Sequence, residues 1–160
     1  MNKVNDILLK KTNTADLETL FGFQLDEDSN YLAGFTSKNP SDKQTYFEKY
    51  TNLLSDHTVN MKTIFLNSEI VGNIAKFEME GNTEITYWID KASWGKGIAT
   101  LALSQFLKIE KRRPIYGRVA FVNFGSIKVL ERCGFTKIGT ETNFANARES
   151  EIEEYIYLLQ

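Results

Sequence analysis

The chain has few of the side chains on which disulfides, metal centres and histidine-based catalysis depend. Its 160 residues include one cysteine and one histidine. Cys133 has no second cysteine to pair with, and Cys133 and His57 together are too few to complete a four-ligand zinc site. His57 lies in the polar stretch Ser-Asp-His-Thr, which is typical of an exposed loop and argues against a Ser-His-Asp hydrolase. Cys133, beside Gly134, could be a nucleophile, but a small half-buried residue next to a helix end fits it better.

Long apolar runs and a strong charge of either sign are also missing. No apolar run approaches the ~18 residues of a membrane span, and the first six residues do not resemble a signal peptide. The formal net charge is −2 and the longest basic run is Lys111-Arg112-Arg113, so avid binding to nucleic acid is not expected. With 42% hydrophobic and 25% charged residues and no linker, residues 1–160 are expected to form one soluble, cytoplasmic domain.

The most informative segment that is present is a glycine-rich turn at residues 94–100 (Trp-Gly-Lys-Gly-Ile-Ala-Thr). Gly95 and Gly97 let the backbone approach a ligand closely, and the helix expected after them offers free N–H groups and the positive end of its dipole. A nucleoside-triphosphate loop is excluded because Asp90 stands where its first glycine belongs. The dinucleotide fingerprint fails at Thr100, where its third glycine belongs. The turn therefore predicts a site for a phosphate-bearing ligand, or else a plain tight turn before a helix.

The order of elements predicts a mixed α/β sheet. Helices are expected from Asn13 to Phe21 and over residues 40–54, 97–111 and 123–132, and residues 24–30 are either irregular or a short helix. Strands are expected over residues 4–11, 61–66, 70–79, 83–89, 115–122, 135–144 and 151–159. The order is β-α-α-β-β-β-α-β-α-β-β, in which a crossover helix makes the strands at 83–89 and 115–122 parallel. We expect helices on both faces of the sheet and no doubly wound nucleotide fold.

A second motif lies about 25 residues after the glycine turn. Residues 123–135 read N-F-G-S-I-K-V-L-E-R-C-G-F, in which Asn123 is a natural helix cap and Gly134 lets the chain reverse. Together with the glycine turn, this motif resembles the GNAT N-acetyltransferase superfamily, particularly its RimJ/RimL-like branch. The acetyl-coenzyme A loop of that family has the form Q/R-x-x-G-x-G/A, and here Gly97 and Ala99 match its last two fixed positions while Trp94 replaces the Gln or Arg. The segment Tyr-Trp-Ile at 87–89 looks like the strand that precedes this loop.

The resemblance implies acetyl-coenzyme A as the acetyl donor and assigns residues to it. The strand at 83–89 would splay from its parallel neighbour, so that pantetheine could pair with the backbone as an added strand would. The residues implied in pantetheine binding are Tyr87, Trp88, Ile89, Asn123 and Ser126, the last near the sulfur. Those implied in pyrophosphate binding are Gly95, Lys96, Gly97, Ile98, Ala99 and Thr100. The Lys96 side chain is either a partner for phosphate or a solvated loop lysine.

The reaction implied is direct attack of an amine on the thioester, which requires no metal. Glu84 is the candidate general base, because it lies on the strand beside the gap; its alternative is a solvated strand carboxylate. Glu154 or water alone is the rival base. Many members of the family use a tyrosine acid seven residues after the helix-capping Asn, and here that position is Leu130. Ser126 is the substitute candidate for protonating the thiolate, and Tyr87 is another possibility.

The acceptor is expected to be a small amine or a peptide N-terminus, bound by residues 21–35 and by the loop at 144–151. These segments carry acidic residues that either favour a cationic amine or form a solvated rim: Asp26, Glu27, Asp28, Glu149, Glu151 and Glu153. A non-catalytic acyl-coenzyme A sensor with the same fold is the alternative function. A tRNA-directed acetyltransferase is the third possibility, and the acidic balance argues against it. A monomer or a homodimer is expected.

Overall fold

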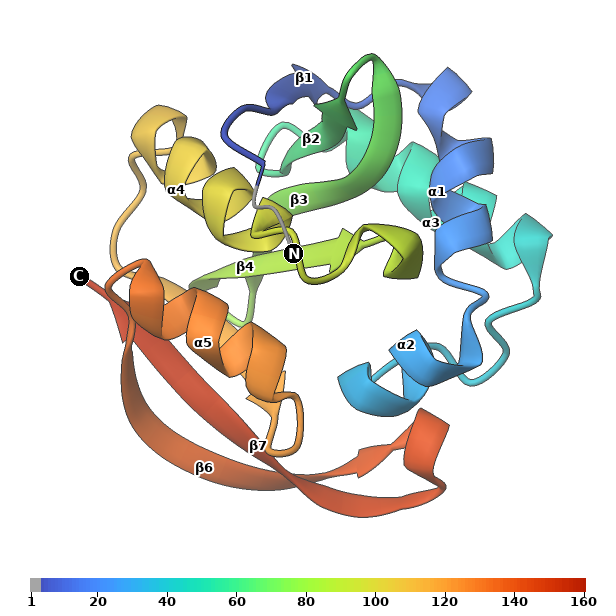
Figure 1. Ribbon diagram of the computed structural model, residues 1–160. Coiled ribbons are helices and arrows are strands. Elements are labelled where there is room, and N and C mark those ends of the chain that lie inside the picture. Colours follow the sequence, from blue (N-terminus) through green and yellow to red (C-terminus); the bar gives the residue numbers. More distant parts are fainter. Residues whose placement is uncertain (1–3) are drawn as a thin grey trace.

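The computed structural model describes residues 4–160, which form a seven-stranded sheet with helices on both faces (Figure 1). The strands are β1 (Leu8–Lys11), β2 (Asn60–Leu66), β3 (Glu69–Met79), β4 (Asn82–Ile89), β5 (Ile115–Ala120), β6 (Thr136–Ala145) and β7 (Ser150–Leu159). The helices are α1 (Leu17–Phe23), α2 (Glu27–Ala33), α3 (Lys43–Ser55), α4 (Ile98–Ile109) and α5 (Phe124–Arg132). Within the described residues, no helix has the length and apolar character needed to cross a membrane.

The strands are arranged in the order β1-β2-β3-β4-β5-β7-β6. Strands β1 to β4 form an antiparallel meander, and α4 is the crossover that makes β4 and β5 parallel, as predicted. Strand β7 lies between β5 and β6 and is antiparallel to both. The parallel contact is short: within residues 4–160, β4 pairs with β5 only at Glu84–Tyr116 and Ile85–Gly117. The outer part of β4 therefore separates from β5, which agrees with the predicted splay.

Two apolar layers hold the helices on the sheet. One face packs against α4, whose Ala102, Leu103 and Phe106 are all 0% exposed. The other face carries a smaller cluster around Leu20 of α1 and Ala75 of β3, with partly buried side chains of α3 packed on it. Because side chains alternate along a strand, β2 and β3 contribute to both layers: Ile64 and Ile74 pack on the α4 side, and Met61 and Ala75 on the other. The sheet thus divides the molecule into an α4/α5 side and an α1/α3 side.

Several boundaries differ from those predicted, and local capping explains two of them. Residues 24–30, whose structure was left open, contain the start of α2, because the Asp26 carboxylate accepts a hydrogen bond from the Ser29 N–H at 2.8 Å. Helix α3 begins at Lys43 rather than at residue 40, because Asp42 caps it. The predicted strand at 4–11 is shorter and begins at Leu8.

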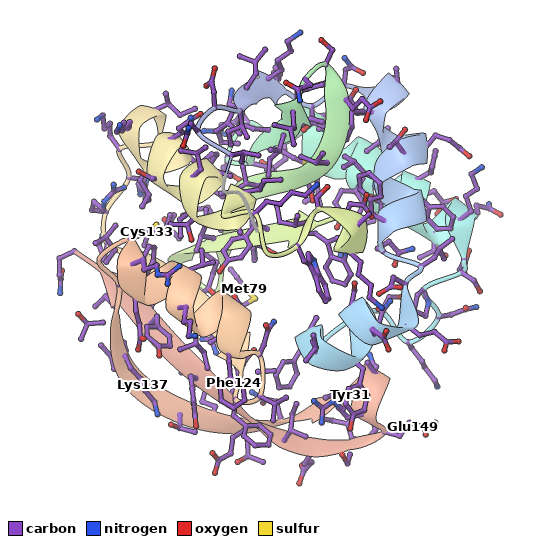
Figure 2. The ribbon with its side chains drawn as sticks, in the orientation of Figure 1. Tyr31, Met79, Phe124, Cys133, Lys137 and Glu149 are labelled. Carbon is purple, nitrogen blue, oxygen red and sulfur yellow. The ribbon has the colours of Figure 1, made fainter. Side chains whose placement is uncertain are left out.

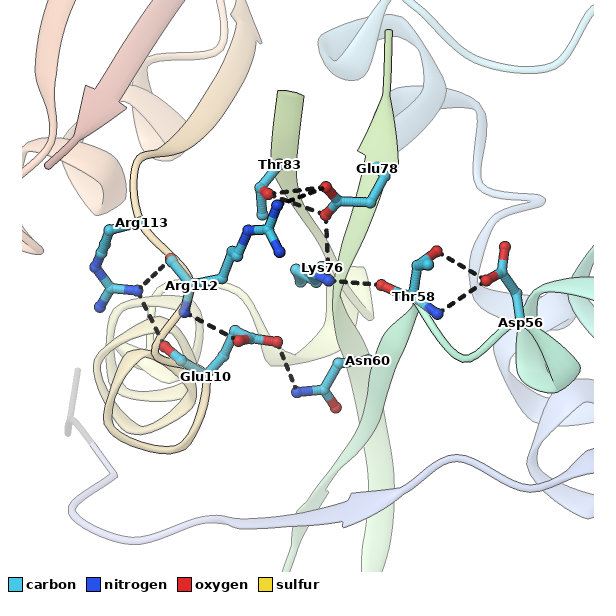
Figure 3. Close-up of polar contacts among 9 residues, drawn as sticks. All are labelled: Asp56, Thr58, Asn60, Lys76, Glu78, Thr83, Glu110, Arg112 and Arg113. Atoms are coloured by element: carbon cyan, nitrogen blue, oxygen red, sulfur yellow. Dashed lines mark hydrogen bonds and ion pairs between the residues drawn. The ribbon is translucent and has the colours of Figure 1, made fainter. Parts of the chain in front are cut away.

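A polar network closes the end of the sheet at which β3 turns into β4 (Figure 3). The Lys76 ammonium of β3 donates to the Thr58 carbonyl at 2.6 Å and pairs with Glu78 at 3.1 Å. Thr83 of β4 donates to the same Glu78 carboxylate, and Arg112 from the loop after α4 lies 3.9 Å from it. Burial works against the ionised form of Glu78, but these donors more than offset it and lower the pKa of this carboxyl group. The network thus links the chain before β2, the β3–β4 turn region and the loop after α4 to one another.

At the opposite end, α2 is fastened to the tip of the β6–β7 hairpin. The Arg148 guanidinium lies 3.6 Å from the ring centroid of Tyr31 and donates to the Tyr31 carbonyl. Asn146 donates to the carbonyl of Thr36, just after α2. Figure 2 labels Tyr31 and Glu149, which mark the helix and the hairpin tip at this junction. These contacts hold α2 and the chain that follows it against the far end of the sheet.

Candidate functional site

A large cavity lies where β4 separates from β5, on the α4/α5 side. This β4–α5 cavity has a volume of about 510 Å³. Its walls are the end of β4, the glycine turn, the first turn of α4 and one side of α5, and Ser29, Leu32 and Ala33 of α2 close it. The predicted cofactor-binding residues that line it are Tyr87, Trp88, Ile89, Gly95, Gly97, Ile98, Ala99, Thr100, Asn123 and Ser126. Lys96 is the one predicted cofactor residue outside this lining.

The glycine turn has the backbone shape that an anion site needs. Gly95 and Gly97 both have φ of 79°, a conformation that costs glycine little and other residues more. Gly97 is the N-cap of α4, so the N–H groups of Ile98, Ala99 and Thr100 have no acceptor within the helix. All three residues line the β4–α5 cavity. The cavity therefore meets a ring of backbone donors at the positive end of a helix dipole.

Two hydrogen bonds hold this turn in place. The Trp94 indole donates to the carbonyl of Ile89 at 3.0 Å, and the carbonyl of Lys96 accepts from the N–H of Val4, also at 3.0 Å. Trp94, which departs from the family's usual Gln or Arg, thus fastens the turn to the end of β4. The second bond involves the Lys96 backbone only. Lys96 is not among the residues that line the β4–α5 cavity.

The start of α5 brings two hydroxyl groups together at the cavity wall. Asn123 caps α5: its side-chain oxygen accepts a hydrogen bond from the Ser126 N–H at 3.3 Å. The Asn123 NH₂ group takes no part in this cap. The Ser126 and Tyr87 hydroxyls are hydrogen-bonded at 2.7 Å. Burial raises the pKa of Tyr87 well above its usual value, so this phenol keeps its proton at neutral pH. A protonated hydroxyl pair therefore faces the gap between β4 and α5.

Leu130, at the position of the family's tyrosine acid, is a core residue. It is 1% exposed, and a Cβ at Gly117 would lie 2.8 Å from its Cδ2 atom. Helix α5 thus packs closely on β5, and a side chain at position 117 would have to displace the end of the Leu130 side chain. Leu130 is not among the residues that line the β4–α5 cavity.

The two predicted general bases belong to one ion-pair cluster on the α1/α3 side of the sheet. Arg118 of β5 contacts Glu84 at 3.2 Å, Glu141 at 3.0 Å and Glu154 at 3.5 Å. Asn143 also donates to Glu154. Glu84 is 2% exposed and lies in the short paired part of β4, just before the splay. Neither Glu84 nor Glu154 is among the residues that line the two cavities described in this section.

Both of these carboxyl groups hold their protons more tightly than usual. Burial raises the pKa of Glu84 above its ordinary 4.5, although the Arg118 charge and hydrogen bond act in the opposite direction. Burial also raises the pKa of Glu154, again against Arg118. One guanidinium cannot compensate three carboxylates, which leaves this cluster with an excess of negative charge.

A second cavity lies on the α1/α3 side of the sheet and has a volume of about 570 Å³. This β4–α3 cavity is walled by β3, β4, α1, α3 and the chain that follows α2. Tyr87 and Trp88 line both cavities, so the two meet at the part of β4 that is unpaired toward β5. Sequence analysis did not predict this cavity.

Sequence analysis also missed two basic residues of the β4–α5 cavity. Lys128 and Arg132 are one helical turn apart on α5, both are exposed, and both line this cavity. The predicted acidic rim lies elsewhere: Asp26 caps α2, and Asp28 forms an ion pair with Lys91. Glu27, Glu149, Glu151 and Glu153 are likewise outside the lining of either cavity. The signal in the sequence was the spacing of four residues between Lys128 and Arg132, which places two basic side chains on one face of the predicted helix.

Comparison with known proteins identifies the family. A search among curated proteins finds no match. The model of the acetyltransferase (GNAT) domain matches residues 6–136, which is most of the chain. The protein therefore belongs to the GNAT acetyltransferase family.

Solved structures share the fold at low sequence identity. RimL, a ribosomal protein alpha-N-acetyltransferase in complex with coenzyme A, is 18% identical, with 98% of this chain and 94% of that chain covered and a TM-score of 0.82. The microcin C7 self-immunity acetyltransferase MccE, in complex with acetyl-coenzyme A and AMP, is 19% identical over 98% and 93%, with a TM-score of 0.78. Spermidine N-acetyltransferase from Vibrio cholerae, in complex with coenzyme A and spermine, is 19% identical over 95% of each chain, with a TM-score of 0.77.

Proposed function

We propose that this protein transfers the acetyl group of acetyl-coenzyme A to a primary amine, either a small molecule or a protein N-terminus. The observation that carries the proposal is the β4–α5 cavity, where an unpaired strand edge, a left-handed glycine turn and a helix N-terminus meet. Membership of the GNAT acetyltransferase family supports the same reaction. The Trp-Gly-Lys-Gly turn favours the RimJ/RimL-like branch, and we propose that the single domain acts in the cytoplasm as a monomer or homodimer.

Each group of residues in the β4–α5 cavity would bind a different part of coenzyme A. The N–H groups of residues 95–100 would hold the pyrophosphate, and the backbone at 87–89 would pair with pantetheine. The NH₂ group of Asn123 would reach a pantetheine amide. Lys128 and Arg132 line the same cavity as the first turn of α4, and α5 approaches that turn where the Cys133 thiol contacts the Thr100 carbonyl. These two basic side chains would neutralise phosphate charge. Lys96 would contribute its backbone only.

The bound donor supplies an acetyl thioester, whose carbon the neutral amine attacks directly. The backbone N–H near Trp88 would polarise the thioester carbonyl. Ser126 and Tyr87 would protonate the thiolate that leaves, because their hydroxyls are hydrogen-bonded to each other and the Tyr87 phenol is protonated at neutral pH. The pair would replace the tyrosine that is absent at Leu130.

Glu84 remains the proposed general base. It lies two residues before Thr86, which lines the β4–α3 cavity, so the amine's proton would have to reach it through water. The excess negative charge of the Arg118 cluster favours taking up that proton. Glu154, in the same cluster, or water alone is the alternative base.

Two measurements test the proposal. Isothermal titration calorimetry with acetyl-coenzyme A should give micromolar or tighter binding at moderate salt, because the donor has both a backbone cradle and basic side chains. A thiol-release assay across a panel of amines and N-terminal peptides should then give turnover. Binding that is absent or millimolar would contradict acetyl-coenzyme A as the donor.

A non-catalytic acyl-coenzyme A sensor is the second candidate. The observation in its favour is that Leu130 is buried where many relatives have an acid, and that Glu84 is engaged by Arg118. A sensor would bind acetyl-coenzyme A tightly but release no thiol with any amine, so the same two measurements separate the two functions.

A further inference from the structure

We propose that the acceptor amine carries an aromatic ring, which binds in the β4–α3 cavity, and that N–H groups beside the ring donate to Asn30 and Thr36. This inference rests on the proposed function, because it names the class of amine for the same reaction.

The position of the β4–α3 cavity suits an acceptor. It lies across the sheet from the proposed donor site and shares Tyr87 and Trp88 with it. These two residues belong to the stretch of β4 that does not pair with β5. An amine held in this cavity would thus approach the thioester through the opening between the strands, from the side opposite to coenzyme A.

Aromatic side chains form part of the cavity wall. They include Phe35, Tyr46, Tyr50, Phe77 and Trp88. The Tyr46 and Tyr50 rings lie one turn apart on α3, with centroids 4.3 Å apart. Aromatic side chains bind a flat ring by stacking and edge-to-face contacts as well as by burying its area, which favours a ring over a flexible chain of the same size.

Two polar atoms at the wall are buried without a partner. In the described part of the chain, Asn30 Oδ1 and Thr36 Oγ1 are the buried side-chain atoms that have no hydrogen bond. Both residues line the β4–α3 cavity, and Asn30 is 7% exposed. The Asn30 NH₂ group donates to the carbonyls of Gln24 and Asp26, so its oxygen is the atom left to accept. Such a buried acceptor normally has a donor, which a ligand N–H would supply.

The charges at the wall argue against a polyamine. The charged residues in the lining are Asp42 and Lys49, one of each sign. The Asp42 carboxylate caps α3 through Thr45, and the Lys49 ammonium lies 5.5 Å from the Tyr50 ring centroid. A chain with several positive charges would find no second carboxylate here. An acceptor with a single amine next to an aromatic ring does not require a second carboxylate.

The experiment compares matched acceptors in the thiol-release assay with acetyl-coenzyme A. The probes are 2-phenylethylamine and phenylalanine amide, against n-butylamine, spermidine and an alanine-led tripeptide. We expect the two aromatic amines to have values of kcat/KM about tenfold or more above the others, the difference that a buried ring makes. A preference for spermidine or for the alanine peptide would overturn the aromatic class while leaving acetyl transfer intact.

Variants on α3 test whether this cavity holds the ring. Tyr46→Leu should raise KM for 2-phenylethylamine about tenfold by removing one aromatic wall, with little change in kcat or in the affinity for acetyl-coenzyme A. The matched control is Phe47→Leu, since Phe47 also packs on Phe21 but is not among the cavity's lining residues. Equal effects of the two variants on KM would overturn the assignment of the ring to this cavity.

The hydrogen-bonding part has its own test. Thr36→Val keeps the shape of the side chain and removes the unpartnered oxygen. It should lower kcat/KM about threefold to tenfold for phenylalanine amide, which has amide N–H donors, and leave 2-phenylethylamine unaffected. Equal behaviour of the two amines would overturn the proposed contact.

If no amine supports turnover, the proposed transferase activity fails, but the ring site can still be measured. Trp88 is part of the cavity wall, so its fluorescence reports binding of 2-phenylethylamine without any reaction. Saturable quenching in the unaltered protein that weakens in Tyr46→Leu but not in Phe47→Leu would support the site. The absence of quenching would overturn it.

Discussion

The hydroxyl pair of Tyr87 and Ser126 gives the most direct prediction for a single residue. Replacing Tyr87 by Phe removes the proton that the thiolate would take, while the ring still packs. We expect kcat to fall roughly 100-fold, within the range for loss of a general acid, with acetyl-coenzyme A affinity nearly unchanged. Steady-state kinetics and calorimetry measure the two quantities. Tyr116→Phe on β5 is the control, since Tyr116 is in the lining of neither described cavity; a similar loss there would remove Tyr87 from the mechanism.

The Arg118 cluster gives a second prediction, on the pH dependence of turnover. If Glu84 is the base, it must be ionised, so kcat/KM should fall as pH drops through its folded pKa, which burial raises above 4.5. In Glu84→Gln, turnover at neutral pH should fall strongly and this acid limb should disappear. Glu141→Gln is the matched control, because Glu141 pairs with the same arginine but is half exposed. Full activity in Glu84→Gln would assign the role to Glu154 or to water.

Which site residues the sequence can reveal depends on how far apart in the chain their neighbours are. Gly95, Gly97 and Asn123 were predicted because each acts through the few residues next to it, as a turn or a cap. The meeting of Glu84 with Glu154 depends on β7 lying between β5 and β6, which no local pattern encodes. The β4–α3 cavity was missed for the same reason, since its walls come from segments separated by dozens of residues.

At the scale of the elements, the contact between β3 and the end of β4 is tight enough to be tested with one methyl group. A Cβ at Gly72 would lie 2.2 Å from the carbonyl oxygen of Trp88, so Gly72→Ala must displace the backbone of β4. We expect a loss of about 1–3 kcal/mol in the free energy of unfolding, as for overpacking, and weaker binding of acetyl-coenzyme A. Urea unfolding and calorimetry measure these effects.

Gly22→Ala is the control for this variant. Gly22 lies inside α1, and nothing lies within 4 Å of a Cβ placed there, so alanine should stabilise the protein by roughly 0.5–1 kcal/mol and leave binding alone. If Gly72→Ala unfolds and binds like the unaltered protein, the end of β4 is not the rigid edge that the proposed pantetheine pairing needs.

The elements themselves were largely predictable, with errors that have local causes. The meander, the crossover helix and the parallel pair followed from alternation, apolar periodicity and turn residues. The helix at Glu27–Ala33 was left open because its sequence is acidic and weakly periodic, and it exists through the Asp26 cap and through Arg148 holding Tyr31. Such a helix depends on tertiary contacts that a single sequence does not display.

For the whole molecule, the sheet separates two tasks. The α4/α5 side carries the glycine turn and basic side chains for the proposed donor, and the α1/α3 side carries the aromatic cavity and the Arg118 cluster. The two sides meet where β4 separates from β5, at Tyr87 and Trp88, which line both cavities. Burial of carboxyl groups beside this opening has a cost for the fold, because a charged group loses hydration there.

That cost predicts how stability varies with pH. The pKa values of Glu84 and Glu154 are raised in the folded state above 4.5, so the folded protein binds more protons than the unfolded chain between the unfolded and folded pKa values. The free energy of unfolding should therefore fall as pH rises through this window, and it should be greater in weakly acidic buffer than at neutral pH. Carboxyl groups with lowered pKa values, such as those of Asp42 and Glu78, act oppositely and lose their contribution at more acidic pH.

Urea midpoints measured from neutral to weakly acidic pH check this sign. The double variant Glu84→Gln, Glu154→Gln keeps the volume of both side chains and removes both titrations, so its midpoint should change less with pH than that of the unaltered protein. Because Arg118 then keeps only the half-exposed Glu141 as a carboxylate partner, the midpoint at neutral pH reports the balance between relieved burial and lost pairing. Parallel curves for the two proteins would mean that neither glutamate holds an extra proton in the folded state, which would contradict the raised pKa values of Glu84 and Glu154.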